Sequence, residues 1–205
     1  MLVVVAASDN QWNELTCSGV KIDWLRVEDA AEFILHKNAN AFFSLKDNKI
    51  LPEFESLNKP VFVNSVLQTL AGLHAPSNVY RINGWAGFLK RTVWEIAGKP
   101  DEVIDSVFKA LNIKTNFVKD EPGFIAARII AMIINEAYFA VEDDVSSKAE
   151  IDTAMKLGTN YPYGPFEWAS MIGTENILAL LQKLYETEER YKPSQFLIKE
   201  KADNN

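Results

Sequence analysis

Short apolar runs recur through the first 120 residues, separated by polar turns and by segments with helical spacing. Residues 2–7 (Leu-Val-Val-Val-Ala-Ala) form a continuous run of this kind, which is typical of a strand covered on both faces. Further strands are predicted at residues 20–27, 39–45, 61–63, 79–82 and 113–117, and helices at residues 28–37, 65–73 and 101–111. Strands alternating with helices predict a small parallel or mixed α/β sheet. The 121 residues before Pro122 are few for a complete doubly wound domain of six strands with their crossovers.

The chain changes character after residue 120 and becomes helical. From Phe124 to Val141 the sequence is apolar on more than one stripe, and a helix that is apolar all round must be buried all round. Ser147 and Glu150 have the spacing of a capping box, and the helix that they begin is expected to end at Gly158.

Two more helices are predicted before the chain ends. Pro165 suits the first turn of a short helix that Gly173 stops, and Thr174 is expected to cap the helix that follows. The last residues are charged and are expected to be disordered. The predicted division is an α/β domain, a helical dimerisation domain and a tail, at residues 1–119, 120–198 and 199–205.

Composition narrows the classes of partner. The chain has 205 residues and is 48% hydrophobic, which allows a buried core in one or two domains. Its formal net charge of −7 would repel a phosphate backbone, so no nucleic-acid partner is expected. No stretch reaches the roughly 18 uninterrupted apolar residues of a membrane span, so no membrane partner is expected either. The lone Cys17 fits a reducing cytoplasm, and with only two histidines a catalytic metal is not indicated.

The first predicted strand is not followed by the glycines that a dinucleotide requires. A backbone approaches a pyrophosphate closely only where side chains are missing, and the usual pattern is therefore Gly-x-Gly-x-x-Gly. Here residues 8–13 read Ser-Asp-Asn-Gln-Trp-Asn, and the first glycine is Gly19. Asp9 would also place a negative charge where phosphate should lie. We therefore expect no cofactor to bind at this turn.

Three motifs follow one another in the second half. They are Pro-Gly-Phe at residues 122–124, Asp-Thr-Ala-Met-Lys-Leu-Gly at 152–158 and Pro-Tyr-Gly-Pro at 162–165. In this order and spacing they resemble the C-terminal domain of the L-3-hydroxyacyl-CoA dehydrogenase family of fatty-acid β-oxidation. The resemblance implies a truncated Rossmann-like α/β domain followed by an all-α domain of the 6-phosphogluconate dehydrogenase C-terminal-like type.

That family oxidises a 3-hydroxyl group by hydride transfer to NAD. A histidine takes the hydroxyl proton, a glutamate orients the histidine, and a serine and an asparagine hold substrate oxygens. The family's motifs place the serine at Ser65 and the glutamate at Glu95, in a strand-like stretch at residues 93–96. The position of the histidine, twelve residues before the glutamate, is Asn83, and that of the asparagine is Ala127. Asparagine cannot take up a proton near neutral pH, so the resemblance implies a lost general base.

Each of these side chains also has a structural interpretation. Ser65 can be the N-cap of a helix after a strand, and Glu95 can be an edge residue that faces water. His74 follows Ser65 by nine residues, but no Gly-x-Ser-x-Gly turn surrounds the serine, so a hydrolase is not indicated. We expect His74 and His36 to be capping or surface residues.

The aromatic turn at residues 160–168 has two interpretations of equal weight. In the family this turn helps to wall the acyl-CoA site, so Tyr161, Tyr163 and Phe166 would line an apolar slot for an acyl chain. They can equally be core residues that close the end of the helical bundle.

The helix from Phe124 to Val141 carries the prediction of quaternary structure. A domain of about 80 residues has difficulty enclosing an all-apolar helix by itself. A second copy of the chain would cover it in a symmetric homodimer, and the resemblance implies the same arrangement.

Three functions remain open from the sequence. The first is a catalytically degenerate 3-hydroxyacyl-CoA dehydrogenase-like protein in fatty-acid metabolism, with an acyl-CoA-binding or dimeric regulatory role, alone or beside a full-length paralogue. The second is an active oxidoreductase that converts 3-hydroxyacyl-CoA to 3-ketoacyl-CoA. The third is an interaction scaffold without a small-molecule site.

Overall fold

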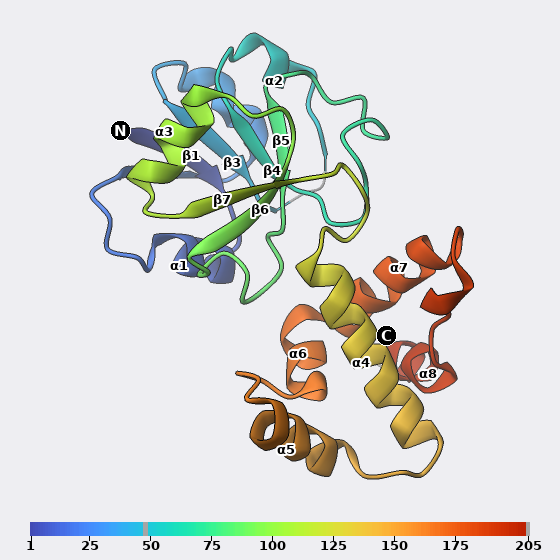
Figure 1. The fold of residues 1–205 in the computed structure, drawn as a ribbon. Coiled ribbons are helices and arrows are strands. Elements are labelled where there is room, and N and C mark those ends of the chain that lie inside the picture. Colours follow the sequence, from blue (N-terminus) through green and yellow to red (C-terminus); the bar gives the residue numbers. More distant parts are fainter. Residues whose placement is uncertain (47–48, 204–205) are drawn as a thin grey trace. The chain divides into compact units, whose positions relative to one another are not determined.

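The computed structural model describes residues 1–46 and 49–203, and the chain forms two compact units (Figure 1). The sheet unit is Met1–Phe124 and the helical unit is Ile125–Asn205. The division falls five residues later than the predicted end of the α/β domain at residue 119. Among the described residues, no helix is long and apolar enough to cross a membrane.

The sheet unit is built on a mostly parallel sheet. Its strands are β1 (Leu2–Ala6), β2 (Asp23–Val27), β3 (Ala41–Ser44), β4 (Val61–Asn64), β5 (Val79–Ile82), β6 (Val93–Ala97) and β7 (Lys114–Val118). They lie in the order β2-β1-β3-β4-β5-β6-β7, and within the described residues every neighbouring pair is parallel except β5 and β6, which are antiparallel. The predicted α/β sheet is therefore confirmed.

The unit is shortened in its crossovers and not in its strands. The connections carry α1 (Asp9–Thr16), η1 (Ala30–Leu35), α2 (Glu53–Ser56) and α3 (Glu102–Ala110). The helix predicted at residues 28–37 is the 3₁₀ helix η1, and α2 has only four residues. Seven strands therefore fit into about 120 residues because several connections are reduced to turns or to the short helices η1 and α2.

The prediction of a helix at residues 65–73 is wrong. This segment is a series of turns, in which the N–H of Leu73 donates to Thr69 O and that of His74 to Ala71 O. Ser65 is thus not an N-cap: its hydroxyl donates to the carbonyl of Gln68 at 3.1 Å. Long-range contacts hold the segment in turns, since Arg81 Nε donates to the carbonyl of Ser65 and the N–H of Ala71 donates to Asp120 Oδ2.

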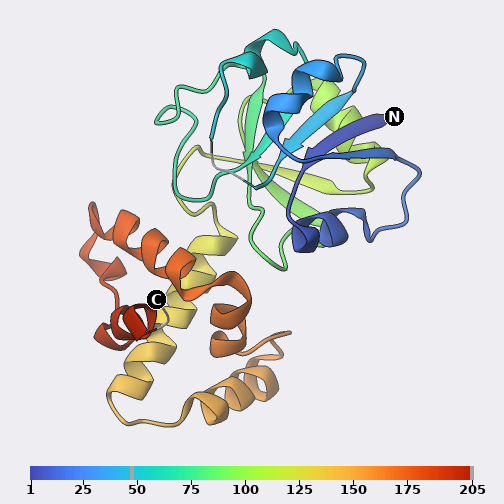
Figure 2. The same cartoon turned by 180° about the vertical axis from the view of Figure 1, so that it is seen from behind.

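Two apolar clusters cover the two faces of the sheet. Figures 1 and 2 show the ribbon of this sheet from opposite sides. On one face α1 and α3 contribute Leu15 and Phe108, which pack with side chains of the central strands. On the other face η1 and α2 contribute Phe33 and Phe54, whose rings stack at 5.8 Å. Because both faces of the sheet are covered, the central strands are buried on both sides. Strands β1 and β3 are accordingly buried along almost their whole length and are mostly apolar.

The helical unit consists of α4 (Ala126–Glu142), α5 (Lys148–Thr159), α6 (Pro165–Ile172), α7 (Thr174–Tyr185), η2 (Glu189–Tyr191) and α8 (Gln195–Asp203). Helix α4 is central and packs against α5, α6, α7 and α8. The capping box of Ser147 and Glu150 is confirmed at the start of α5, and Pro165 opens α6. An asparagine in the left-handed conformation, Asn160 at φ 55°, ends α5.

Two details of the helical unit differ from the prediction. Thr174 is not a cap: Gly173, at φ 94°, ends α6 and precedes α7, and Thr174 is already helical. The tail from Lys199 is not disordered up to Asp203, because α8 includes it and Glu200 pairs with Lys148. This ion pair holds the last helix to α5.

Candidate functional site

The carboxyl ends of the parallel strands meet at one edge of the sheet, where ligands bind in open α/β folds. Two of the predicted site residues lie there. Ser65 follows β4 and is fully buried, and its carbonyl accepts a hydrogen bond from Arg81 Nε at 2.9 Å. Asn83 follows β5 and is 8% exposed.

The pairing of β5 with β6 relates Asn83 to Glu95. The register Arg81↔Ala97 and Ile82↔Ile96, continued by one residue, puts Asn83 opposite Glu95. The sheet therefore sets these two positions across from each other, as a histidine and the glutamate that orients it would need to be. Glu95 is half-buried in the middle of β6.

The amide of Asn83 is only partly engaged. Its Oδ1 accepts from the N–H of Trp85 at 3.1 Å, while its Nδ2 is buried without a hydrogen-bond partner in the described part of the chain. A buried, unpartnered N–H₂ can donate to a bound group, but it cannot accept a proton.

Two other amides close this edge, and sequence reasoning did not single them out. Gln11 Nε2 donates to the carbonyls of Leu45 at 2.8 Å and Gly84 at 3.3 Å. Asn64 Nδ2 donates to Leu45 O at 3.2 Å, and its Oδ1 accepts from Gly84 N at 2.9 Å. The ends of β1, β3, β4 and β5 are thus joined to one another by side-chain amides. The available signal was an amide directly after a strand, at Asn64.

The turn after β1 is closed in a similar way. Ser8 caps α1 and forms a capping box with Gln11. Arg26 Nη2 donates to the carbonyl of Ala7 at 2.9 Å and pairs with Asp9 Oδ1 at 2.7 Å. The N–H of Gln11, in the first turn of α1, therefore has a protein acceptor, and the carboxylate of Asp9 stands beside it.

The end of β2 carries an acidic residue that sequence reasoning also missed. Glu28 lies twenty residues after Ser8, the place where dinucleotide-binding folds carry the acid that binds a ribose. Here Lys46 binds it, through Glu28 Oε1 at 2.7 Å and the Glu28 carbonyl at 3.0 Å. The hydrogen bond from Lys46, together with its charge, lowers the pKa of the exposed Glu28 carboxyl.

The remaining predicted site residues belong to the helical unit. Ala127 is fully buried in α4. The rings of Tyr161 and Tyr163 contact Trp168 at centroid distances of 5.5 and 6.3 Å, and Phe166 meets Tyr138 edge to face at 5.0 Å.

These three predicted aromatic residues are half-buried, whereas Trp168 and Tyr138 beneath them are buried. Lys148 Nζ lies 5.2 Å from the ring centroid of Phe166 and 5.1 Å from that of Tyr138. The predicted aromatic set therefore packs within the helical bundle and keeps part of its surface accessible.

One face of α4 is not covered by its own unit. Ile125 and Ile129 are 49% and 54% exposed. A groove of about 480 Å³ runs along this face and is lined by Arg128, Ile129, Met132, Ile133, Glu136, Arg190 and Tyr191. The opposite face packs into the bundle through residues such as Ile130 and Ile134.

Neither histidine has a catalytic setting. His74 is exposed, and His36 is the C-terminal cap of η1. In the described ranges no group of three or more His, Cys, Asp or Glu side chains could hold a metal ion.

The two units together define a class: a doubly wound sheet followed by a helical bundle around one long helix. Residues 123–205 match the family model described as the 3-hydroxyacyl-CoA dehydrogenase C-terminal domain. Sequence relatives include the 3-hydroxyadipyl-CoA dehydrogenase of Escherichia coli, 49% identical over 82 residues, and the 3-hydroxybutyryl-CoA dehydrogenase of Clostridioides difficile, 44% identical over 84 residues. The helical unit is thus similar in sequence to the C-terminal domain of the 3-hydroxyacyl-CoA dehydrogenase family.

The matches cover small parts of the curated relatives. The two alignments take in 39% and 40% of this chain, but only 17% and 30% of those proteins. The predicted resemblance is confirmed over the helical unit, which is the part of the chain that these relatives match.

Solved structures extend the likeness to the sheet unit. The (S)-3-hydroxybutyryl-CoA dehydrogenase of Ralstonia eutropha aligns over 99% of this chain and 93% of that chain, with a TM-score of 0.78 and 19% identity, which shows the shared fold. The 3-hydroxybutyryl-CoA dehydrogenase of Escherichia coli is 34% identical over 68% of this chain and 31% of that chain, with a TM-score of 0.57. An alignment of that extent is longer than the helical unit, so it continues into the sheet unit.

Proposed function

We propose that this protein is a catalytically degenerate member of its family, which does not transfer hydride and works through acyl-CoA binding in a dimeric regulatory assembly. The observation that carries the proposal is the carboxyl edge of the sheet. There the hydroxyl of Ser8 caps α1 and Lys46 pairs with Glu28, at the turn and at the acid where a dinucleotide would bind.

The residues at this edge do not fit NAD. A pyrophosphate needs free backbone N–H groups and a glycine turn, whereas here Ser8 caps the helix and Asp9 adds a negative charge. Glu28, the acid suited to a ribose, is held by Lys46. These contacts support the proposal that the sheet unit keeps the fold but does not bind a dinucleotide.

The lost base supports the same proposal. The register puts Asn83 opposite Glu95, where the family resemblance places the histidine and its glutamate. Loss of a general base costs on the order of 10²–10⁴ in rate. Without a site for the hydride acceptor, the reaction has no partner for the hydride at all.

An acyl-CoA role rests on the aromatic turn. Tyr161, Tyr163 and Phe166 are half-buried on buried rings, which suits a surface that receives an apolar chain. A dimeric role rests on the uncovered face of α4, where Ile125 and Ile129 expose apolar surface beside a groove. The partner in that assembly is a second copy of this chain or a full-length family member. The exposed, unpaired Cys17 supports a location in the reducing cytoplasm.

The test is NADH-dependent reduction of acetoacetyl-CoA, followed at the absorbance of NADH. The proposal expects no turnover above the uncatalysed background. Turnover that Glu95→Gln abolishes would instead establish the active oxidoreductase.

A thermal-shift titration separates binding from scaffolding. Acetoacetyl-CoA should raise the melting temperature, and the size of the shift should follow mass action. Free CoA is the control for the acyl chain, and Tyr161→Ala should reduce the response to acetoacetyl-CoA only. A chain that responds to neither ligand would be an interaction scaffold.

A further inference from the structure

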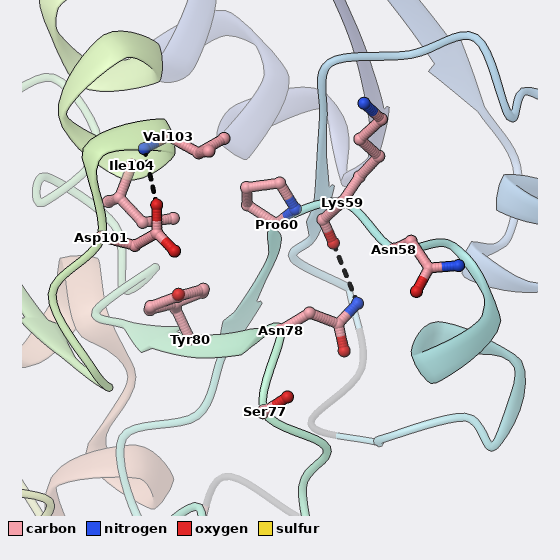
Figure 3. Close-up of a pocket in the computed structure, with 9 residues that line it drawn as sticks. All are labelled: Asn58, Lys59, Pro60, Ser77, Asn78, Tyr80, Asp101, Val103 and Ile104. Atoms are coloured by element: carbon pink, nitrogen blue, oxygen red, sulfur yellow. Dashed lines mark hydrogen bonds between the residues drawn. The ribbon is translucent and has the colours of Figure 1, made fainter.

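A second hollow lies at the other edge of the sheet, at the amino ends of β4 and β5. Its volume is about 250 Å³, and Figure 3 shows the side chains around it. Its lining comes from the turn before β4, the turn before β5, β5 itself and the start of α3, in the residues Asn58, Lys59, Pro60, Ser77, Asn78, Tyr80, Asp101, Val103 and Ile104. The hollow belongs wholly to the sheet unit and shares no residue with the carboxyl edge.

The amide of Asn78 lies at the side of the hollow that Lys59 and Ser77 also line (Figure 3). Its Nδ2 donates to two carbonyls, those of Lys59 at 2.9 Å and Phe54 at 2.8 Å. Because both partners are acceptors, the nitrogen must face them, and this fixes the direction of the amide. The Oδ1 atom is left without a hydrogen-bond donor among the residues that the structure describes.

Only one of the two carboxylate oxygens of Asp101 accepts a hydrogen bond from the described part of the chain. One carboxylate oxygen accepts from the N–H of Val103 at 2.8 Å and caps α3 (Figure 3). The other oxygen has no hydrogen-bond partner in residues 1–46 and 49–203. A carboxylate has about four lone-pair sites, so it can bind a ligand while it caps the helix.

Tyr80 lines the hollow beside Asp101 (Figure 3). The tyrosine is 5% exposed, and its ring lies against Gly98, where a Cβ would come within 2.5 Å of the ring. The absence of a side chain at Gly98 therefore allows this position of the ring. Burial, and secondarily the charge of Asp101, raise the pKa of the Tyr80 hydroxyl, so the phenol stays neutral and can both donate and accept.

The polar atoms around the hollow are thus mostly acceptors with one negative charge. The ammonium group of Lys59 points away from it in Figure 3 and does not neutralise Asp101 there. An anion would be repelled, and no metal-binding group of three His, Cys, Asp or Glu side chains exists in the described residues. The chemistry that fits is a donor-rich organic cation, because a primary ammonium offers three N–H donors and a positive charge.

We propose that this pocket binds a small primary alkylamine, with its ammonium group held by Asp101 and Tyr80. The alkyl part lies against Pro60 and Ile104, which form the apolar side of the hollow. Since the volume is below the range of drug-sized ligands, the fitting molecules are short amines or diamines.

The test is an NMR titration of the full chain with 1,4-diaminobutane. Saturable shifts are expected at the amides of residues 77–80 and 101–104. The neutral analogue 1,4-butanediol has the same length without the charge, and succinate reverses the charge. Neither should produce these saturable shifts.

Asp101→Asn is the informative variant because asparagine is as good an N-cap as aspartate, so α3 is retained while the charge is lost. It should weaken diamine binding by about 10-fold or more, the scale of a charge-assisted hydrogen bond. Glu102→Gln removes the same charge from the neighbouring exposed residue, outside the lining, and should leave binding unchanged. Tyr80→Phe should weaken binding by a smaller factor.

Two results would overturn the proposal. One is the absence of saturable shifts with the diamine. The other is an equal loss of affinity in the Asp101 and Glu102 variants, which would mean that the diamine is attracted only by the general negative charge of the surface.

Discussion

The guanidinium of Arg81 pairs with the carboxylate of Asp120 inside the sheet unit, where Arg81 is 0% exposed. Arg81 also donates to the carbonyl of Ser65 and lies over the ring of Phe124 at 4.7 Å. The N–H of Gly123 donates to Val66 O at 2.7 Å in the same region. This buried cation thus ties the turn that carries Ser65 to the end of the sheet unit.

Loss of the carboxylate at Asp120 should strongly destabilise the sheet unit. Asp120→Ala leaves a buried arginine without its counter-charge, and breaking such a pair costs about 3 kcal/mol, the low end for a buried pair because Asp120 is partly exposed. Urea unfolding followed by circular dichroism measures the difference. The exposed pair of Arg26 and Asp9 provides the control, since Asp9→Ala should change stability by less than about 1 kcal/mol. Equal losses in the two variants would contradict the structural role given to Arg81.

Two glycine-to-alanine substitutions should have opposite effects. A Cβ at Gly84 would come within 2.7 Å of Asn64 Cγ, so Gly84→Ala should disturb the amide bridge and cost about 1–3 kcal/mol. A Cβ at Gly158, in α5, meets nothing within 4 Å. Gly158→Ala should therefore stabilise the protein by about 0.5 kcal/mol through helix propensity. Thermal denaturation of the two variants tests both signs.

The helical unit should lose stability in acid through two capping glutamates. The hydrogen bond from the Lys156 side chain, followed by that from the Gly164 N–H, lowers the pKa of Glu167, and those from Ser147 and Ser146 lower the pKa of Glu150. A carboxyl group whose pKa is lowered in the folded state stabilises the fold fully above its unfolded pKa, roughly 4.3 for glutamate. That stabilisation is lost as the pH falls through the pKa of the folded state.

Melting temperatures measured between about pH 6 and about pH 3 should show this loss. This range brackets the pKa of an unperturbed glutamate, which is roughly 4.3. Glu167→Gln should lower the melting temperature at the upper end of the range and flatten the fall at the lower end. Glu175→Gln, at an exposed residue in the first turn of α7, is the control. A Glu167 variant with an unchanged slope would count against the capping role.

A charge on the uncovered face of α4 should prevent self-association. Ile129→Glu places a carboxylate in the apolar groove, and sedimentation velocity should show a shift from dimer to monomer. Leu157 is 82% exposed on α5, away from that groove, so Leu157→Glu should leave the dimer intact. A wild-type chain that is monomeric at all concentrations would contradict the proposed assembly.

Restoring the histidine should not restore activity. Asn83→His returns an imidazole to the position opposite Glu95, but it leaves Gln11 bonded to Leu45 and Gly84. The NADH-dependent reduction of acetoacetyl-CoA should therefore stay at background. Activity in this variant alone would mean that the edge opens for a cofactor and that the base was the main loss.

Much of the fold could be predicted from local patterns. The buried strands β1 and β3 are continuous apolar runs, and the capping box at Ser147 fixes the start of α5 by local hydrogen bonds. Such features depend on neighbouring residues and can be read from spacing alone. The motifs at residues 122–165 added the family, because their order is specific.

The wrong prediction of a helix at residues 65–73 and the missed role of Gln11 both result from contacts between distant segments. The stretch after Ser65 has helical spacing, yet Asp120 accepts from the N–H of Ala71 and Arg81 binds the carbonyls of Ser65 and Val66. These partners lie 15 to 49 residues away, and they hold the stretch in turns. The role of Gln11 was missed for the same reason, since its acceptors are 34 and 73 residues distant.

Direct measurement of NADH binding tests the central claim. Isothermal titration of the wild-type chain with NADH should give no saturable heat, because Ser8 caps α1 at a turn without glycines and Lys46 pairs with Glu28. A saturable one-to-one isotherm that weakens in a variant of this edge, such as Glu28→Ala, would contradict the account.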